Sequence, residues 1–344
     1  MRYRYLGRTG VRVSSLCLGT LMIGPWGGNT REDSLALIGR ALDEGINYID
    51  TADSYSHGEA ERIVGAALTK PSVRDRVVLA TKVYSPMGVD LNARGLSRRW
   101  ILHEVEQSLR RLNTDRIDLY QVHRPDPATD LEETIDALSD LVHAGKIRYF
   151  GTSTFPAHLL VEAQWSARRS GRCRPVCEQP PYSLLAREIE ADVLPCCRKY
   201  HLGAVVWSPL AGGWLSGRYR TGVDAAVSAR GNRWPLRYDL SLEDNQRKLV
   251  AVERLALLAA EAGLTLIELA IAFTLHHADV TAAIIGPRTI EHLESQFSAA
   301  DVVLDDDLLD RIDKIVPPGT TLNPADGGWK APELTDSTLR RRRT

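Results

Sequence analysis

Three side chains of different chemistry stand at the ends of short apolar segments of the sequence: Asp50, Lys82 and His123. Tyr55 lies in a polar stretch five residues after Asp50. An ammonium group beside a phenol lowers the pKa of the phenol, and a carboxylate keeps that ammonium charged in a partly buried site. A histidine N–H can hold a substrate oxygen next to the phenol. If the segments are neighbouring parallel strands, these groups meet at one rim and can donate a proton during reduction of a carbonyl.

Each of these residues has a simpler explanation when it is taken alone. A lysine after a strand is usually a surface residue, and His123 could belong to an ordinary loop. The joint placement of three strand ends and Tyr55 favours a catalytic group. The rival is a metal site, but Cys17 and Gly19 stand on the first strand where barrel hydrolases have a His-x-His pair. We therefore expect no metal.

No side chain can deliver a hydride, so a carbonyl reductase needs a redox cofactor. Two glycine-containing segments follow late apolar strands: 208–218, which ends on Arg218, and 286–288, which ends on Arg288. Their backbone N–H groups and arginines could bind phosphates. The first segment has glycines at P-loop spacing, but an arginine replaces the P-loop lysine, which disfavours an NTPase. Trp207, at the end of the preceding strand, could stack on a flat ring.

The elements that must position these residues alternate between strand and helix along the chain. Short, almost wholly apolar segments predict strands at 16–20, 46–50, 76–81, 117–122, 146–151, 175–179, 203–207 and 282–286. Helical periodicity, N-cap residues and terminal glycines predict helices at 31–44, 58–69, 97–112, from 129 or 130 to 144, and at 156–169 and 186–200.

Eight such repeats predict an α/β fold, a closed (β/α)8 TIM barrel rather than an open doubly wound sheet. No G-x-G-x-x-G follows the first strand, and the candidate residues come from several strands. We expect one domain over 1–344, with an N-terminal β-hairpin at 2–15, the barrel at about 16–300 and a C-terminal helix and tail at about 301–344. The stretch 211–244 is too long for an idle connection and is expected to be a functional loop.

The composition excludes several classes of protein. The 344-residue chain is 44% hydrophobic and carries a formal net charge of -1, which argues against a general nucleic-acid binder, and four arginines at 340–343 are read as a solvated end. No apolar run approaches the roughly 20 residues that span a bilayer, and the first residues lack a secretory signal. We expect a cytoplasmic protein that binds neither nucleic acid nor membrane; homo-oligomerisation is compatible with the sequence.

A set of spaced motifs resembles the aldo-keto reductase family over nearly the whole chain. The motifs that carry the resemblance are Leu6-Gly7-Arg8-Thr9-Gly10, Leu18-Gly19-Thr20, Ile49-Asp50-Thr51-Ala52-Asp53-Ser54-Tyr55, Thr81-Lys82, Asp115-Arg116-Ile117-Asp118-Leu119-Tyr120-Gln121-Val122-His123, Gly145-Lys146-Ile147-Arg148, Gly151-Thr152-Ser153, Gln179-Pro180-Pro181-Tyr182, Ser208-Pro209-Leu210 and Ile285-Gly286-Pro287-Arg288. The resemblance implies a barrel that binds NADPH or NADP+ in extended form and reduces an aldehyde, ketone or keto-sugar.

The same resemblance implies roles for individual residues. Tyr55 would be the general acid, Lys82 and Asp50 its tuning pair, and His123 the group that orients a small-molecule carbonyl substrate, with Trp26 and Tyr84 beside it. The cofactor would be bound by Gly19, Thr20, Asp50, Ser153, Gln179, Trp207, Ser208, Pro209, Leu210, Gly212, Gly217, Arg218, Gly286, Arg288 and Gln296. In that set Ser153 and Gln179 would hold the nicotinamide carboxamide, Trp207 would stack on its ring, and Arg288 would meet the 2′-phosphate.

The chain departs from the family pattern at several of these positions. Ser153 is followed by Thr154 where the family commonly has asparagine, and Trp207 stands where tyrosine is usual. His292, Ser295 and Gln296 replace frequent adenine-binding residues, so Arg288 is the main support for NADPH over NADH.

Two alternatives remain beside a general carbonyl reductase. One is a reductase of a nucleotide-linked deoxysugar intermediate, which would need a pocket near Trp26, Tyr84, Trp214 and Trp329. The other is a cofactor-binding regulatory subunit like the potassium-channel β subunits. The specificity loops carry no readable code, so the sequence does not name the substrate.

Overall fold

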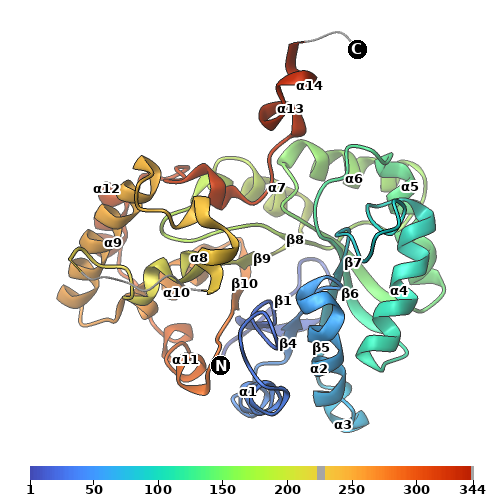
Figure 1. Ribbon diagram of the computed structural model, residues 1–344, viewed down its shortest axis with the longest axis horizontal. Helices are drawn as coiled ribbons and strands as arrows, with labels where there is room; N and C mark the ends of the chain where they lie inside the picture. The colour runs from blue at the N-terminus through green and yellow to red at the C-terminus, as the bar shows by residue number, and fades with distance from the viewer. Residues whose placement is uncertain (223–228, 342–344) are drawn as a thin grey trace.

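Eight parallel strands close into a barrel in the computed structural model, which describes residues 1–222 and 229–341 (Figure 1). The barrel order is β10-β3-β4-β5-β6-β7-β8-β9, and β10 pairs with both β3 and β9. The strands are β3 (Leu16–Gly19), β4 (Tyr48–Asp50), β5 (Val78–Val83), β6 (Ile117–Val122), β7 (Ile147–Ser153), β8 (Cys177–Gln179), β9 (Gly203–Trp207) and β10 (Val280–Ile285). The predicted (β/α)8 barrel is confirmed.

The strands are buried on both sides, which explains why their sequences read as apolar runs without alternation. On β3, Cys17 belongs to a small cluster with residues of the neighbouring strands, whereas Leu16 and Leu18 belong to the larger cluster that includes helix residues. Successive side chains of a strand point to opposite sides, so one set fills the barrel and the other packs against the helices.

Three helices begin where capping residues predict. Thr30 forms a capping box with Asp33, and the side chains of Ser97 and Asp130 accept hydrogen bonds from the first turns of their helices. The longer helices are α1 (Arg31–Asp43), α2 (Glu59–Ala67), α4 (Arg98–Leu112), α5 (Leu131–His143), α6 (Ala157–Arg169), α7 (Val193–Tyr200), α9 (Glu243–Glu261), α10 (Leu266–His276) and α12 (Asp306–Ile315); α3 (Pro71–Arg74) and α11 (Ile290–Glu294) are short.

The predicted helix at 186–200 is wrong in its first half. Residues Glu188–Glu190 form a 3-10 turn, and α7 begins only at Val193. Pro195 explains this start, because proline has no N–H to donate and is tolerated only in the first turn of a helix. Ala186 instead pairs with Thr321 of the C-terminal segment.

The N-terminal hairpin forms as expected and closes one end of the barrel. Strand β1 (Tyr3–Tyr5) pairs antiparallel with β2 (Arg12–Ser14). Leu6 and Val13 are buried in the same cluster as Cys17, Tyr48 and other residues inside the barrel. The hairpin therefore seals the end opposite to the carboxyl ends of the strands.

The long stretch 211–244 contains short helical turns: η3 (Ala211–Ser216), α8 (Ala229–Arg233) and η4 (Pro235–Arg237). Residues 223–228 of this predicted functional loop, and 342–344 of the arginine-containing end, lie outside the described residues. The C-terminal segment contains η6 (Pro324–Gly327), α13 (Pro332–Thr335) and α14 (Ser337–Arg341), and Figure 1 shows α13 and α14 projecting from the body of the molecule. The division into hairpin, barrel and C-terminal part within one domain stays a prediction.

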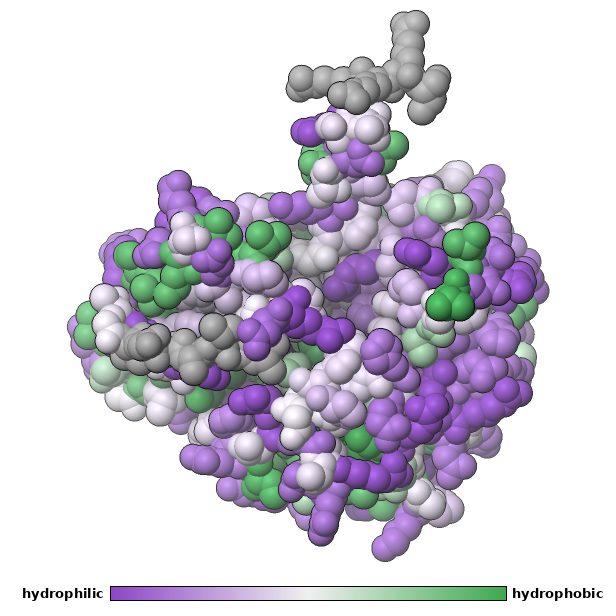
Figure 2. Space-filling view, viewed as in Figure 1, coloured by the Kyte–Doolittle hydropathy of each residue, from purple (hydrophilic) through white to green (hydrophobic). Residues whose placement is uncertain are grey.

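The surface on one side of the molecule is largely hydrophilic, and its hydrophobic side chains form separate small groups (Figure 2). Within 1–222 and 229–341, no single helix is long and apolar enough to cross a membrane. The pair α9 and α10 meets the length and composition together, but it is bent by 93° at its break.

Candidate active site

Asp50, Lys82 and Tyr55 form a hydrogen-bonded chain at the carboxyl end of the barrel. The Lys82 ammonium donates to Oδ2 of Asp50 at 2.5 Å, to the main-chain oxygen of Thr51 at 2.8 Å and to the Tyr55 hydroxyl at 3.3 Å. Lys82 is fully buried, and Asp50 is 2% exposed. Lys82 lies inside β5 rather than after it, because that strand runs on to Val83. The structure thus brings together three residues that the sequence places far apart.

The ionisation of this chain is set by burial and by the charge of Asp50. Burial alone would lower the pKa of Lys82, but the Asp50 carboxylate and Tyr55 raise it above its ordinary value, so the ammonium stays charged. The sequence predicts that Lys82 lowers the pKa of Tyr55 below its ordinary value, and this prediction is wrong. Burial raises the pKa of Tyr55 above its ordinary value, and the opposing effect of Lys82 is smaller. Tyr55 therefore carries its proton at neutral pH, as a proton donor must.

A strained turn presents the Tyr55 side chain. Ser56, His57 and Gly58 follow it with φ values of 48°, 54° and 86°. The left-handed conformation costs a non-glycine residue roughly 1–2 kcal/mol. Two such residues in succession indicate that the surrounding contacts fix the turn, and conformations of this kind cluster at functional sites.

His123 stands beside Tyr55 as predicted. The two ring centroids are 5.8 Å apart at an interplanar angle of 73°. Burial, with the charges of Arg124 and Lys82, lowers the pKa of His123 well below its ordinary value. Its Nδ1 is buried and has no hydrogen-bond partner in the described structure. A neutral imidazole with an unused ring nitrogen can orient a substrate oxygen but is not a source of positive charge.

Two glutamines hold the other oxygen of Asp50, and one of them was missed by the sequence analysis. Gln121 and Gln179 donate to Oδ1 of Asp50 at 3.1 and 2.8 Å. Gln179 also donates to Oε1 of Gln121 at 3.2 Å. Gln121 lies on β6 two residues before His123, which directly follows that strand, so the alternation of a strand would have indicated that both point inward. The glutamines fix the carboxylate that keeps Lys82 charged.

A cavity of about 890 Å³ joins this group to all the residues expected to bind the cofactor. Its lining includes Gly19, Thr20, Asp50, Ser153, Gln179, Trp207, Ser208, Pro209, Leu210, Gly212, Gly217, Arg218, Gly286, Arg288 and Gln296, together with Tyr55, His123, Trp26 and Tyr84. Lys82 stands behind them, in contact with Asp50 and Tyr55. The segments after β9 and β10 thus border one cavity, although they lie about 70 residues apart in the sequence.

Several features of the cavity fit a dinucleotide. Trp207 Nε1 and Gln296 Oε1 are buried polar atoms without partners in the described structure, and so they are free to bind a ligand. At Gly286 a Cβ would come within 3.3 Å of Nη2 of Arg230, so the glycine leaves room beside that guanidinium. Ser153 donates to the main-chain oxygen of Gln179 at 2.8 Å, which places the two expected carboxamide-binding residues together. The residues present therefore fit a nicotinamide dinucleotide.

The sequence analysis missed four arginines that also line the cavity: Arg124, Arg230, Arg233 and Arg237. The guanidinium carbon of Arg233 lies 3.5 Å from the ring centroid of Trp26, so the loop after β9 reaches the loop after β3. Three of the arginines come from 229–244, whose irregular sequence carries no periodic signal. Arg124 directly follows His123, and this position next to a candidate catalytic residue could have indicated that Arg124 also reaches the cavity.

The pocket suggested for a nucleotide-linked sugar does not form as expected. Trp26 and Tyr84 line the cavity, and the Trp26 ring centroid is 6.4 Å from that of Tyr55. Trp214 is instead fully buried and stacks on Tyr219 with ring centroids 4.5 Å apart. Trp329 lines a different cavity. The prediction that the four side chains form one pocket is wrong.

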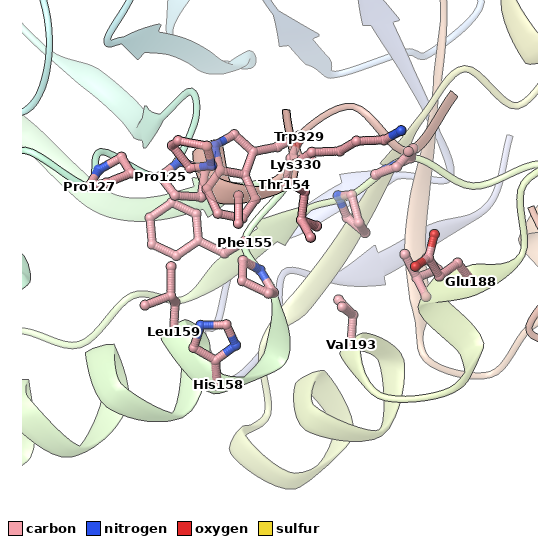
Figure 3. Close-up of a pocket in the computed structure, with 18 of the residues that line it drawn as sticks. Pro125, Pro127, Thr154, Phe155, His158, Leu159, Glu188, Val193, Trp329 and Lys330 are labelled. Carbon is pink, nitrogen blue, oxygen red and sulfur yellow. The ribbon is translucent and has the colours of Figure 1, made fainter. Parts of the chain in front are cut away.

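This second cavity has a volume of about 1020 Å³ and is drawn in Figure 3. Figure 3 shows Phe155, His158 and Leu159 on one side of it, with Trp329 and Lys330 of the C-terminal segment closing another. In the C-terminal segment, Gly327 and Trp329 line this second cavity, whereas Gly328 lines the first. A Cβ at Gly328 would come within 2.6 Å of Cζ2 of Trp207, so only glycine lets the segment lie against that ring.

Glu178 is a buried carboxyl next to Gln179 and supports the end of β7, where Ser153 lies. It accepts hydrogen bonds from Thr152 Oγ1 at 2.5 Å and from the Phe155 N–H at 3.1 Å. Burial nevertheless raises its pKa from 4.5 to about 7.

The raised pKa of Glu178 predicts a pH-dependent stability. The folded protein binds the proton more tightly than the unfolded chain, so this stabilisation is present below about pH 4.5 and is lost as the pH rises through 7. We expect the stability advantage of Glu178→Gln over the native protein to increase by about 2 kcal/mol between roughly pH 5.5 and 8.5. Urea unfolding across that range measures it, with Glu32→Gln as the exposed control. A difference that does not change with pH would contradict the assignment.

In the described residues, no three histidine, cysteine or acidic side chains cluster as metal ligands, and the five cysteines are free thiols.

Known proteins resemble the chain over most of its length. The sequence model of the Aldo/keto reductase family matches residues 15–317. The "Uncharacterized oxidoreductase YrpG" of Bacillus subtilis (strain 168) is 41% identical, over 92% of this chain and 96% of its own length. A "Putative voltage-gated potassium channel subunit beta" of Schizosaccharomyces pombe is 34% identical (91% of this chain and 93% of its own). A "Probable voltage-gated potassium channel subunit beta" of Oryza sativa subsp. japonica is 36% identical (92% and 97%). With the barrel and the site in view, these matches show that the chain belongs to the aldo/keto reductase family.

Proposed function

We propose that this protein is an NADPH-dependent reductase that converts an aldehyde, ketone or keto-sugar carbonyl to an alcohol. The observation that carries the proposal is the chain from Asp50 through Lys82 to the Tyr55 hydroxyl, beside His123, in a cavity lined by all the expected cofactor-binding residues. Membership of the aldo/keto reductase family supports it.

The residues of the chain have separate tasks in this proposal. His123 and Tyr55 hold the carbonyl oxygen, and Tyr55 donates its proton to that oxygen as negative charge develops there. Lys82 stabilises the resulting phenolate, and Asp50 keeps Lys82 charged. When bound, the reduced nicotinamide supplies the hydride; Ser153 and Gln179 would hold its carboxamide, and Trp207 its ring.

The test is steady-state oxidation of NADPH by the purified protein with a panel of aldehydes, ketones and keto-sugars. We expect turnover with at least one class of carbonyl, and none without a carbonyl. Tight cofactor binding with no turnover on the whole panel would contradict the proposal and favour a regulatory subunit, a role suggested by the names of the fungal and plant relatives.

Arg288 should set the preference for NADPH over NADH. It lines the cavity with His292, Ser295 and Gln296, and its main-chain oxygen accepts from Asn29 at 2.5 Å, which anchors the segment. A hydrogen bond to a charged group contributes about 1.5–3 kcal/mol. We therefore expect Arg288→Met to weaken NADPH binding by about 10- to 100-fold and NADH binding by less than about threefold, as measured by fluorescence titration. Equal losses for both cofactors would rule out this contact with the 2′-phosphate.

A further inference from the structure

The catalytic cavity has more positive charge than a cofactor alone accounts for. Six arginines line it, whereas Asp50, which is bound to Lys82, is its only lining carboxylate among the described residues. Arg218 and Arg288 lie in the segments expected to face the phosphates, and Arg230 lies beside Gly286 of the second segment. Of the others, Arg237 forms an ion pair with Asp326 at 2.6 Å, and Arg233 stacks on Trp26. Arg124 remains to be explained.

Arg124 is a partly buried guanidinium that lines the cavity. Its Nη1 donates to the main-chain oxygen of His123 at 2.5 Å, and its guanidinium carbon lies 5.9 Å from the ring centroid of Trp207. It forms no ion pair with a described carboxylate. The charge of Glu178 acts on Arg124, but this carboxyl already accepts hydrogen bonds from Thr152 and Phe155. A guanidinium has five N–H donors, so most of those of Arg124 remain unused.

A partly buried charge without a counter-ion is stabilised when a ligand in the cavity supplies the opposite charge. The charge of Arg124 acts on both Tyr55 and His123, which places it at the reacting end of the cavity rather than at the phosphate end. A ligand held by Tyr55 and His123 is therefore near enough to supply the missing counter-ion. Arginine is well suited to this, because its planar fork binds a carboxylate or a phosphate through two parallel hydrogen bonds.

We propose that the substrate is a carbonyl compound that also carries an anionic group, a carboxylate or a phosphate, and that Arg124 binds this group while Tyr55 and His123 hold the carbonyl oxygen. The proposal rests on the proposed reductase function. The anion is unchanged in the reaction: the carbonyl carbon gains the hydride of NADPH, the oxygen gains the proton of Tyr55, and NADP+ leaves. Arg124 thus selects the substrate and holds it so that its carbonyl oxygen lies next to the Tyr55 hydroxyl.

The test compares matched carbonyls with the intact protein and NADPH: 4-carboxybenzaldehyde against benzaldehyde, and glyceraldehyde 3-phosphate against glyceraldehyde. We expect the native protein to favour the anionic member of at least one pair by about tenfold or more in kcat/KM. Arg124→Met should lower kcat/KM for that anionic carbonyl by about 10- to 100-fold and for its neutral partner by less than about threefold, as expected for a charged hydrogen bond. Whichever pair responds identifies the anion.

Two further variants separate recognition from folding. Arg124→Lys keeps the charge without the fork and should recover part of the loss. Arg247→Met removes an arginine that is paired with Asp244 outside the cavity, and it should match the native protein. Equal losses on the anionic and neutral carbonyls in Arg124→Met would overturn the proposal and leave Arg124 as a support for His123.

A binding measurement distinguishes the absence of an anion site from the absence of reductase activity. In the NADP+-loaded protein, benzoate and inorganic phosphate are titrated while tryptophan fluorescence is followed. We expect at least one to bind to the native protein and about tenfold more weakly to Arg124→Met. Anion binding without turnover would contradict the reductase function but not the anion site; no binding of either anion, together with no preference in the carbonyl pairs, would refute the site.

Discussion

Replacing Tyr55 by phenylalanine should lower turnover by about 100-fold or more while cofactor affinity stays within about threefold. The hydroxyl is the only group lost, and it is the end of the chain that begins at Asp50 and passes through Lys82. The ring can still occupy its place beside His123, so the cavity keeps its shape. Steady-state kinetics with the best carbonyl of the panel and fluorescence titration with NADPH measure the two effects.

The control for this variant is Tyr5→Phe, which removes a hydroxyl from the exposed hairpin, where Tyr5 is 56% exposed. It should match the native protein in both measurements. Unchanged turnover in Tyr55→Phe would remove Tyr55 from the role of general acid. A large loss of cofactor affinity would show that its hydroxyl acts in binding instead.

Replacing Lys82 by methionine should damage both turnover and stability. Asp50 would keep two hydrogen bonds from glutamines but would lose its counter-ion in a site with almost no solvent. Removing one partner of a buried ion pair typically costs about 3–5 kcal/mol of unfolding free energy. We expect a loss of that size in urea unfolding, and a loss of turnover at least as large as that of Tyr55→Phe.

The double variant Lys82→Met/Asp50→Asn separates these two effects. A neutral amide no longer needs a counter-ion, so about half or more of the lost stability should return. Turnover should not return, because no ammonium faces Tyr55. If Lys82→Met unfolds at the same urea concentration as the native protein, the buried ion pair does not have the energetic role given to it here.

Much of the barrel and of the catalytic group could be predicted from the sequence because both depend on local regularities. The buried parallel strands appear as short apolar runs, and Thr30, Ser97 and Asp130 mark helix starts by their own side chains. Parallel strands bring their carboxyl ends to one rim, so residues at those ends meet whatever their separation in the sequence.

The rest depends on contacts that no local pattern encodes. The pKa of Tyr55 was expected to fall because Lys82 is its neighbour, but the depth of burial decides the sign, and burial is a property of the whole fold. Arg230 and Arg233 reach the cavity from an irregular loop. Trp214 and Trp329 were grouped with Trp26 by residue type alone, although one is buried and the other faces the second cavity.

The hairpin under the barrel gives the two ends of the molecule independent roles. Leu6 and Val13 fill the amino-terminal end of the barrel with apolar side chains. The residues assigned to catalysis and cofactor binding lie at the opposite end, around the cavity. In the part of the chain that the structure describes, the cavity lies at the carboxyl ends of the strands, so substitutions in the hairpin core are expected to change stability rather than substrate selectivity. The stability of the fold and the selectivity for substrate can then change independently of each other, by evolution or by design.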